Sequence, residues 1–295
     1  MPGVAQRTFA RFARQPRRGY CRRQAREAVF VGAPRAFPRR EQILEKALAK
    51  IQRRITRQRA KLALRDSNFH LENLYKHVTI FPDSGLAYNR IKKCANTRIA
   101  AFFTDILSGE TFDNSLAMKR GLVKPADLSY AELMRIRAYY SVVFVRNPYG
   151  RVLSVFLDKL AAGGQSRART YGRCPGFGDN SREGFLAFLE YLDSGGLHDN
   201  LHWWPQSELL YQPPADFSFI GRLERTVPDM RQILAAIGQD PDLAVALDAP
   251  HALEAKRKQA VTAASSRVDD YYTDRGRDIV RQLYSADFDN FDYQK

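Results

Sequence analysis

The sequence predicts an α/β protein with a central, mostly parallel sheet flanked by helices. From residue 71 onward, short apolar runs rich in β-branched residues alternate with longer stretches of helical periodicity, a pattern typical of such sheets. Two of the predicted strands, residues 86–91 and 141–145, end in polar turns that open helices. Because ligands of parallel sheets bind beyond the carboxyl ends of the strands, these two turns are the candidate functional site.

The predicted elements follow one another through residues 71–295. Strands are expected at residues 78–81, 86–91, 141–145 and 216–220. Helices are expected at residues 97–107, 130–139, 148–160, 182–192, 228–238 and 275–284. Pro148 suits the first turn of its helix, because the N–H that proline lacks has no helical partner there. Residues 163–180 are Gly-rich and show no periodicity, so we expect a long loop that shapes the site.

The basic charge of the chain is concentrated near its N-terminal end. Residues 1–65 hold 19 Lys and Arg against 3 Asp and Glu, a net charge of +16, whereas the other 230 residues have a net charge of −1. Residues 1–40 are Arg-rich with four scattered prolines, which predicts a disordered basic arm. Residues 41–68 are expected to form an amphipathic helix, because Ile and Leu recur there at three- and four-residue steps. The globular domain then occupies residues 71–295.

These two N-terminal segments admit several interpretations. Residues 1–40 fit an extension without function, a segment attracted to an anionic membrane or acidic polymer, or a mitochondrial-type targeting peptide. The helix fits packing against the globular domain or a second copy, and it also fits a membrane surface. No apolar run of about 18 residues is present, and three widely spaced cysteines argue against a disulfide framework. We therefore expect a cytoplasmic protein, with peripheral contact at the inner membrane as an option.

Each of the two polar turns has the chemistry of a phosphate site. The segment from Tyr88 to Arg98 offers lysines, small residues and a hydroxyl at the start of a helix, where backbone N–H groups point outward. The segment from Val142 to Ser154 carries Arg146 at the end of a buried strand. A cation there needs an anionic partner, and phosphate provides a bidentate one. Two such turns imply a ligand with phosphates at both ends.

The two segments resemble the cofactor-binding motifs of the sulfotransferases, which use 3′-phosphoadenosine 5′-phosphosulfate (PAPS). Lys93 and Thr97 fall in the places of the first motif, and Arg146, Pro148 and Ser154 fall in those of the second. Residues 200–205 (Asn-Leu-His-Trp-Trp-Pro), residues 217–224 and the Tyr-rich tail to residue 293 are similar to further stretches of carbohydrate sulfotransferases. The resemblance runs in order from about residue 86 to residue 293 and implies the P-loop-like sulfotransferase fold.

The resemblance also implies a role for each matching residue. Lys93 is the expected catalytic cation, and His202 is the expected base. The expected cofactor-binding residues are Lys92, Cys94, Ala95, Asn96, Thr97, Arg98, Arg146, Ser154 and Arg222. No metal is expected, because a sulfuryl group carries less charge than a phosphoryl group and a lysine can then take the place of Mg²⁺. Lys92 stands where the family usually has proline, which leaves open which of the two lysines faces the cofactor.

Several roles stay open at this point. His202 could hold its loop by hydrogen bonds instead of accepting a proton. The other candidate bases are His198, Glu110, Asp113 and Glu183. Cys94 is read as a small packing residue, and Arg222 could pair with Glu224 instead of a phosphate. Trp203 and Trp204 could stack on a sugar ring or the adenine, although at least one is expected in the core.

The sequence thus predicts a sulfotransferase that moves a sulfuryl group from PAPS to a hydroxyl of a carbohydrate or glycoconjugate by in-line transfer. Family members in animals are membrane-anchored, so a chain without an anchor is expected to be bacterial. One alternative is a P-loop nucleotide kinase or NTPase, but the sequence contains no Gly-x-x-x-x-Gly-Lys-Ser/Thr stretch. The other is a non-catalytic, cationic membrane- or nucleic-acid-binding protein that acts through residues 1–65.

Overall fold

The computed structural model describes residues 39–109, 112, 115–249 and 263–295. The predicted basic arm lies outside these residues apart from its last two, and so do the candidate bases Glu110 and Asp113. By its internal contacts the chain divides into the units Met1–Ala47 and Leu48–Lys295. None of the helices in the described ranges is both long and apolar enough to cross a membrane.

The predicted amphipathic helix is present as α1 (Arg39–Ala63). In the part of α1 that belongs to the second unit, Ala60 and Ala63 are buried. The large apolar side chains Leu48, Ile51 and Leu62 are 55%, 55% and 60% exposed. The end of the helix therefore packs through small residues and leaves an apolar stripe exposed.

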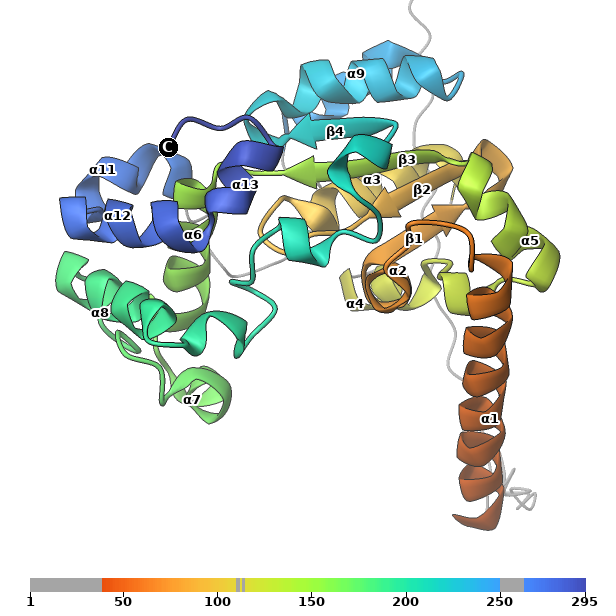
Figure 1. Ribbon diagram of the computed structural model, residues 1–295, viewed down its shortest axis with the longest axis horizontal. Coiled ribbons are helices and arrows are strands. Elements are labelled where there is room, and N and C mark those ends of the chain that lie inside the picture. The colour runs from red at the N-terminus through yellow and green to blue at the C-terminus, as the bar shows by residue number, and fades with distance from the viewer. Residues whose placement is uncertain (1–38, 110–111, 113–114, 250–262) are drawn as a thin grey trace, which may run out of the picture. The chain divides into compact units, whose positions relative to one another are not determined.

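A four-stranded sheet in the order β1-β2-β3-β4 forms the centre of the second unit (Figure 1). The strands are β1 (Val78–Phe81), β2 (Leu86–Asn89), β3 (Tyr140–Val145) and β4 (Phe219–Arg222). β1 is antiparallel to β2, whereas β2, β3 and β4 are parallel. This confirms the mostly parallel sheet. The last strand starts three residues later than predicted, because residues 214–216 form a 3₁₀ turn.

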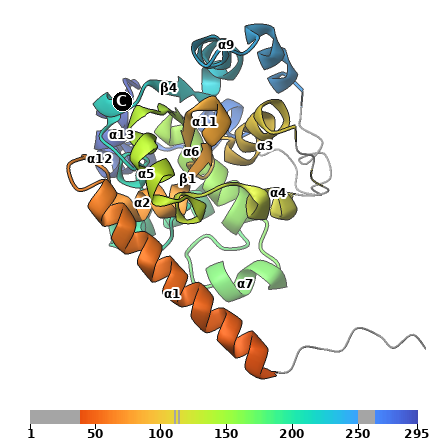
Figure 2. The same cartoon turned by 90° about the vertical axis from the view of Figure 1, so that its right-hand side faces the viewer.

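Helices cover both faces of the sheet. Tyr88 and Phe144 project to one face, where they pack with α3 (Asn96–Leu107), α4 (Ser115–Gly121) and α9 (Thr226–Ala236). Ala87 and Val143 project to the opposite face, where α2 (Leu71–His77) and α5 (Tyr130–Arg135) pack. In Figure 2, α3 lies on one side of the strands, and α2 and α5 lie on the other. The predicted three-layer arrangement is therefore present.

A third apolar cluster lies beyond the carboxyl ends of the strands. Figure 1 shows it as a group of helices around α6 (Pro148–Phe156). The other helices of this group are α8 (Arg182–Asp193), α11 (Val268–Tyr271), α12 (Asp274–Leu283) and α13 (Ser285–Asn290). Trp203 is 1% exposed within this cluster, which confirms that one of the two tryptophans is a core residue.

Two segments differ from the predictions. The helix expected at residues 148–160 ends in a π-helical turn, η4 (Leu157–Ala161), and such turns often occur at functional sites. The long loop expected at residues 163–180 contains α7 (Gln165–Tyr171), so that prediction was wrong. Tyr171 is the single buried residue of α7, and one apolar contact leaves no periodic signal in the sequence.

Candidate active site

The loop between β2 and α3 has an unusual backbone. Lys93 and Ala95 adopt positive φ values of 71° and 51°, a region that residues with a side chain rarely occupy. Between them, Cys94 is buried and its thiol donates a hydrogen bond of 3.1 Å to Gln206 Oε1. Burial raises the pKa of this thiol to about 12, which supports Cys94 as a packing residue. Strain of this kind is typical of functional sites.

This loop leads into a helix start that no side chain caps. Ala95 is the N-cap residue of α3, and the first helical hydrogen bond runs from Ile99 N to Ala95 O at 3.0 Å. The N–H groups of Asn96, Thr97 and Arg98 therefore have no partner within the helix. Such a helix start carries partial positive charge and accommodates an anion.

Arg146 follows β3 and brings the two turns together. Its side chain is buried, and its Nη1 donates to Lys93 O at 3.4 Å while Nη2 donates to Ser265 Oγ at 2.9 Å. Burial lowers the pKa of the guanidinium. The Nε atom is buried without a hydrogen-bond partner among the described residues. A buried donor without a partner is costly unless a ligand satisfies it, so this position suits an anion.

Helix α6 presents its predicted serine to the same place. A Cβ atom at Gly150 would lie 3.3 Å from Arg146 Nε, so the absence of a side chain lets the guanidinium lie against the helix. Ser154 is one helical turn beyond Gly150 and therefore on the same face of α6. It is 5% exposed. Its part in cofactor binding stays a prediction.

Lys93 forms a buried ion pair that the sequence did not indicate. Its Nζ contacts Asp158 Oδ2, and the same oxygen lies 3.1 Å from Lys159 Nζ. The side chains of Lys93 and Asp158 are only 13% and 16% exposed. Burial lowers the pKa of Lys93 to about 8, although Asp158 opposes this shift. For Asp158, burial alone would raise the pKa, but the charges and hydrogen bonds of the two lysines lower it to about 2.

His202 is held as a neutral imidazole near these charges. Its Nδ1 lies 2.7 Å from Asn200 Oδ1. Because an amide oxygen only accepts, Nδ1 carries the proton and Nε2 keeps its lone pair. Burial, followed by the positive charges of Lys92, Lys159 and Lys93, lowers the pKa of His202 to about 3. At neutral pH the imidazole is therefore uncharged, and its Nε2 carries no proton.

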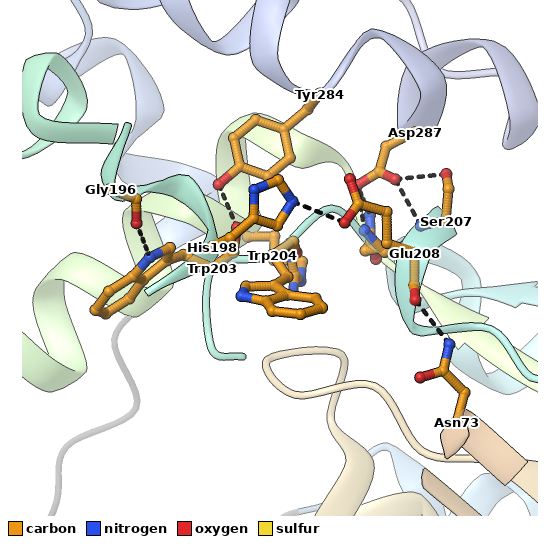
Figure 3. A network of polar contacts seen from close by, with 11 residues as sticks. Asn73, Gly196, His198, Trp203, Trp204, Ser207, Glu208, Tyr284 and Asp287 are labelled. Atoms are coloured by element: carbon orange, nitrogen blue, oxygen red, sulfur yellow. Dashed lines mark hydrogen bonds and ion pairs between the residues drawn. The ribbon is translucent and has the colours of Figure 1, made fainter. Parts of the chain in front are cut away.

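The other candidate bases in the described residues lie in different surroundings. His198 is exposed, and its Nε2 lies 2.8 Å from Glu208 Oε2 (Figure 3). Glu183 is exposed in the first turn of α8. The charge of Lys93 contributes to the lowered pKa of His202, so His202 lies within electrostatic reach of Lys93.

A buried arginine that sequence analysis missed joins the two loops of the site. Arg151 in α6 is 1% exposed. It donates to Lys92 O at 3.2 Å on one side, and to Trp204 O at 2.7 Å and His202 O at 3.4 Å on the other. Its guanidinium thus fixes the lysine loop relative to the histidine loop. In the sequence, Arg151 stands out only as a cation within an apolar stretch of a predicted helix. Residue spacing alone does not show what such a cation contacts.

A second buried network fixes Arg146. Gln206 Nε2 donates to Arg146 O at 2.8 Å, and Gln206 Oε1 accepts from Arg146 N at 2.9 Å. The carboxylate of Asp287 in α13 in turn accepts from Gln206 N at 2.7 Å, Ser207 N at 2.8 Å and Ser207 Oγ at 2.6 Å. Figure 3 shows this carboxylate beside Ser207, and the same view includes Tyr284, which donates to Trp203 O at 2.5 Å. The segment after His202 is therefore anchored on the C-terminal helices.

Two of the predicted cofactor-binding arginines have partners in the protein. Arg98 Nη2 donates to the carbonyl oxygens of Leu247 and Ala249. Arg222 Nη2 donates to Phe291 O at 2.9 Å and Asp292 Oδ2 at 3.2 Å. Their part in cofactor binding stays a prediction.

The alternative pairing of Arg222 with Glu224 was wrong. Glu224 accepts hydrogen bonds from Asn147 N and Tyr293 Oη, both at 2.9 Å. The arginine instead lies over the ring of Tyr293, 5.1 Å from its centroid. The C-terminal tail thus separates the charges that the sequence suggested as partners.

Comparison with known proteins gives one family and several relatives. The profile described as "Sulfotransferase family" matches residues 76–294. Carbohydrate sulfotransferase 14 of Mus musculus is 28% identical over 184 residues, which are 57% of this chain and 48% of the relative. The proteins of the same name from Danio rerio and Homo sapiens are 26% and 27% identical and are covered to 50% and 48% of their lengths. The chain thus spans about half the length of these curated relatives. No solved structure gives a significant match.

The Asp287 network predicts a large effect of a single substitution on stability. In Asp287→Ala, the buried N–H groups of Gln206 and Ser207 lose their acceptor. We expect the free energy of unfolding to fall by at least about 2 kcal/mol, measured by urea denaturation. The matched control is Asp289→Ala in the same helix, whose carboxylate is 64% exposed and pairs with Lys295; it should change stability little. Equal effects of the two substitutions would contradict the network.

Two histidines, buried His77 and partly buried His202, predict that stability falls in mild acid. Burial lowers the pKa of His77 to about 4 and that of His202 to about 3, from 6.5. Below pH 6.5 the unfolded chain therefore binds more protons than the folded chain does. The free energy of unfolding is highest above pH 6.5 with respect to these groups, and it declines below that pH. We expect a loss of up to about 1.4 kcal/mol per pH unit for each histidine, measured by urea unfolding between pH 7.5 and 5. His77→Phe should reduce this slope, whereas the exposed His198→Gln should not.

Proposed function

The chain belongs to the sulfotransferase family, and from this premise we propose that it transfers a sulfuryl group from PAPS to a hydroxyl group of a carbohydrate or glycoconjugate. The observation that carries the proposal is the contact between Arg146 and the backbone of Lys93. It joins two turns that each suit phosphate at the carboxyl edge of the sheet. The carbohydrate acceptor rests on the names of the relatives, which match this chain over about half their length.

The residues present fit the two phosphate ends of PAPS. The uncapped start of α3, with Asn96 and Thr97, would hold the 5′-phosphosulfate through backbone N–H and side-chain groups. Arg146 and Ser154 would hold the 3′-phosphate, which would satisfy the unpartnered Nε of the arginine. Bound PAPS would supply the sulfuryl group and the phosphate on which charge develops. Nucleotide binding on a P-loop-like fold is part of this proposal.

The side chains of this chain would then perform three tasks. Lys93 places an ammonium where negative charge grows on the leaving phosphate, and a preorganised cation at that point lowers the barrier. His202 offers the lone pair of Nε2 to the proton of the attacking hydroxyl. Arg151 holds the two loops at a fixed separation, so that the donor and the acceptor can align. No metal takes part in this mechanism.

We also propose that the protein is a bacterial one located in the cytoplasm. The exposed apolar stripe of α1 and the basic charge of residues 1–65 support contact with an anionic membrane surface. Co-sedimentation with anionic and neutral vesicles would test this contact, and equal binding to both would contradict it.

The cofactor assignment predicts a binding measurement. The chain should bind 3′-phosphoadenosine 5′-phosphate, the desulfated cofactor, with micromolar affinity and without Mg²⁺, and it should not bind ATP comparably. Isothermal titration calorimetry with both nucleotides, with and without Mg²⁺, measures this directly. A preference for Mg²⁺-ATP would favour the kinase alternative.

Arg146→Ala should weaken binding of the desulfated cofactor by more than about 100-fold, because removing one partner of a buried charge pair costs about 3–5 kcal/mol. The control is Arg231→Ala on α9, whose side chain is 48% exposed and pairs with exposed Asp242. It should bind like the parent chain. Unchanged affinity in Arg146→Ala, in a protein with a normal thermal melt, would remove Arg146 from the site.

The assignment of the base predicts a different kinetic result. His202→Gln should lower kcat by about 10²–10⁴-fold and leave the affinity for the desulfated cofactor nearly unchanged. Transfer of labelled sulfate from PAPS to a panel of desulfated polysaccharides measures the rate. The rival His198→Gln should retain activity, since His198 pairs with Glu208 at the surface. Full activity of His202→Gln would give this histidine a structural role only.

A further inference from the structure

Asp158 is a buried carboxylate placed between two lysines. Its Oδ2 contacts Lys93 Nζ and lies 3.1 Å from Lys159 Nζ, and the three side chains are 16%, 13% and 22% exposed, respectively. Asp158 and Lys159 both belong to the π-helical turn that ends α6. The contact joins residues that are 65 positions apart in the sequence. The π-helical turn thus carries the carboxylate that pairs with the lysine of the first proposed phosphate motif.

The other charged groups around Lys93 are cations. Lys159 and Arg146 both lower its pKa, Lys92 is its neighbour in the loop, and His202 from the third loop is neutral. Asp158 is the one group that raises the pKa of Lys93 among those found to influence it. Without this carboxylate, a buried ammonium would face like charges and would lose its proton.

We propose that Asp158 is a positioning residue, which keeps Lys93 protonated and holds its ammonium in a resting position before the cofactor binds, and which then pairs with Lys159 alone. The proposal rests on the proposed function of Lys93. A phosphate ligand would draw the Lys93 ammonium away from Asp158. Lys159 would then still compensate the carboxylate, so its release from Lys93 leaves no buried charge unpaired. Because Lys159 remains paired with Asp158, Lys93 can leave the carboxylate for a phosphate ligand.

Asp158 is not itself well suited to accept the proton of the acceptor. The two lysines stabilise its carboxylate and hold its pKa at about 2. Its Oδ2 is already paired with the ammonium groups of Lys93 and Lys159, so accepting a further proton would break two ion pairs. The role of Asp158 is therefore exerted through Lys93.

The first test needs no sulfotransferase activity. The rate at which acetic anhydride labels Lys93, followed by peptide mass spectrometry between pH 6 and 11, reports the pKa of this amine. In the parent chain we expect a midpoint near pH 8. Asp158→Asn should move the midpoint down by about 1–3 pH units, and Lys159→Met should move it up, because Lys159 opposes protonation of Lys93.

Two controls accompany the labelling. Asp278→Asn removes an exposed carboxylate that pairs with Arg281 and should not move the Lys93 midpoint. Asp158→Glu keeps the charge and should restore most of the parent value. A midpoint that is unchanged or higher in Asp158→Asn, in a chain with a normal thermal melt, would overturn the proposal.

The second test separates binding from turnover. At pH 6, where Lys93 is protonated in the parent chain, Asp158→Asn should bind 3′-phosphoadenosine 5′-phosphate several-fold more tightly, because one negative charge near the phosphate has been removed. As the pH rises, kcat/KM of Asp158→Asn should begin to fall at a lower pH than kcat/KM of the parent chain does. A parallel loss of affinity and kcat would indicate a merely structural role and would contradict the proposal. If the parent chain binds no such nucleotide, the proposed function fails, whereas the labelling midpoints still decide the role of Asp158.

Discussion

The carboxamide of Gln206 closes the sheet at the point where the site begins. Hydrogen bonding between strands stops near the end of β3, yet Arg146 follows in a buried position with both of its backbone polar groups to satisfy. Gln206 supplies a donor and an acceptor at 2.8 and 2.9 Å, as another strand would. Gln206 Oε1 also accepts a hydrogen bond from the Cys94 thiol, and the backbone N–H of Gln206 donates to Asp287. The lysine loop, the arginine and the C-terminal helix are therefore mutually fixed.

This constraint explains how the protein tolerates so many buried cations. Arg146 and Arg151 are almost fully buried, and Lys93 is nearly so. Each guanidinium nitrogen of Arg151 donates to a backbone carbonyl oxygen of the surrounding loops, whereas Arg146 retains an unpartnered Nε among the described residues and Lys93 depends on Asp158. Burying a charge without full compensation destabilises the fold. This destabilisation occurs at the two positions where an anionic ligand would complete the compensation, as is expected of a functional site.

Side-chain amides recur as substitutes for backbone pairing throughout this region. Asn89 accepts from Tyr211 N at 2.9 Å, and Asn73 donates to Glu208 O and Leu210 O at 2.7 and 2.8 Å. Together with Gln206, these groups hold the segment after His202 against the edge of the sheet by side-chain hydrogen bonds in place of strand pairing. The loop that carries His202 is thus fixed by side-chain hydrogen bonds, which suits the role of base that we propose for this histidine.

The sequence by itself determined the strands, most helices and the two polar turns that follow β2 and β3, because these depend on short-range patterns. Hydrophobic periodicity located β1, β2 and β3. Only the tertiary structure decided which charges meet. Asp158 of the π-turn contacts Lys93, Arg151 joins two loops that each lie more than 50 residues from it in the sequence, and Arg222 bonds to the C-terminal tail. Such pairings depend on backbone geometry and long-range packing, which leave no periodic trace in a single sequence.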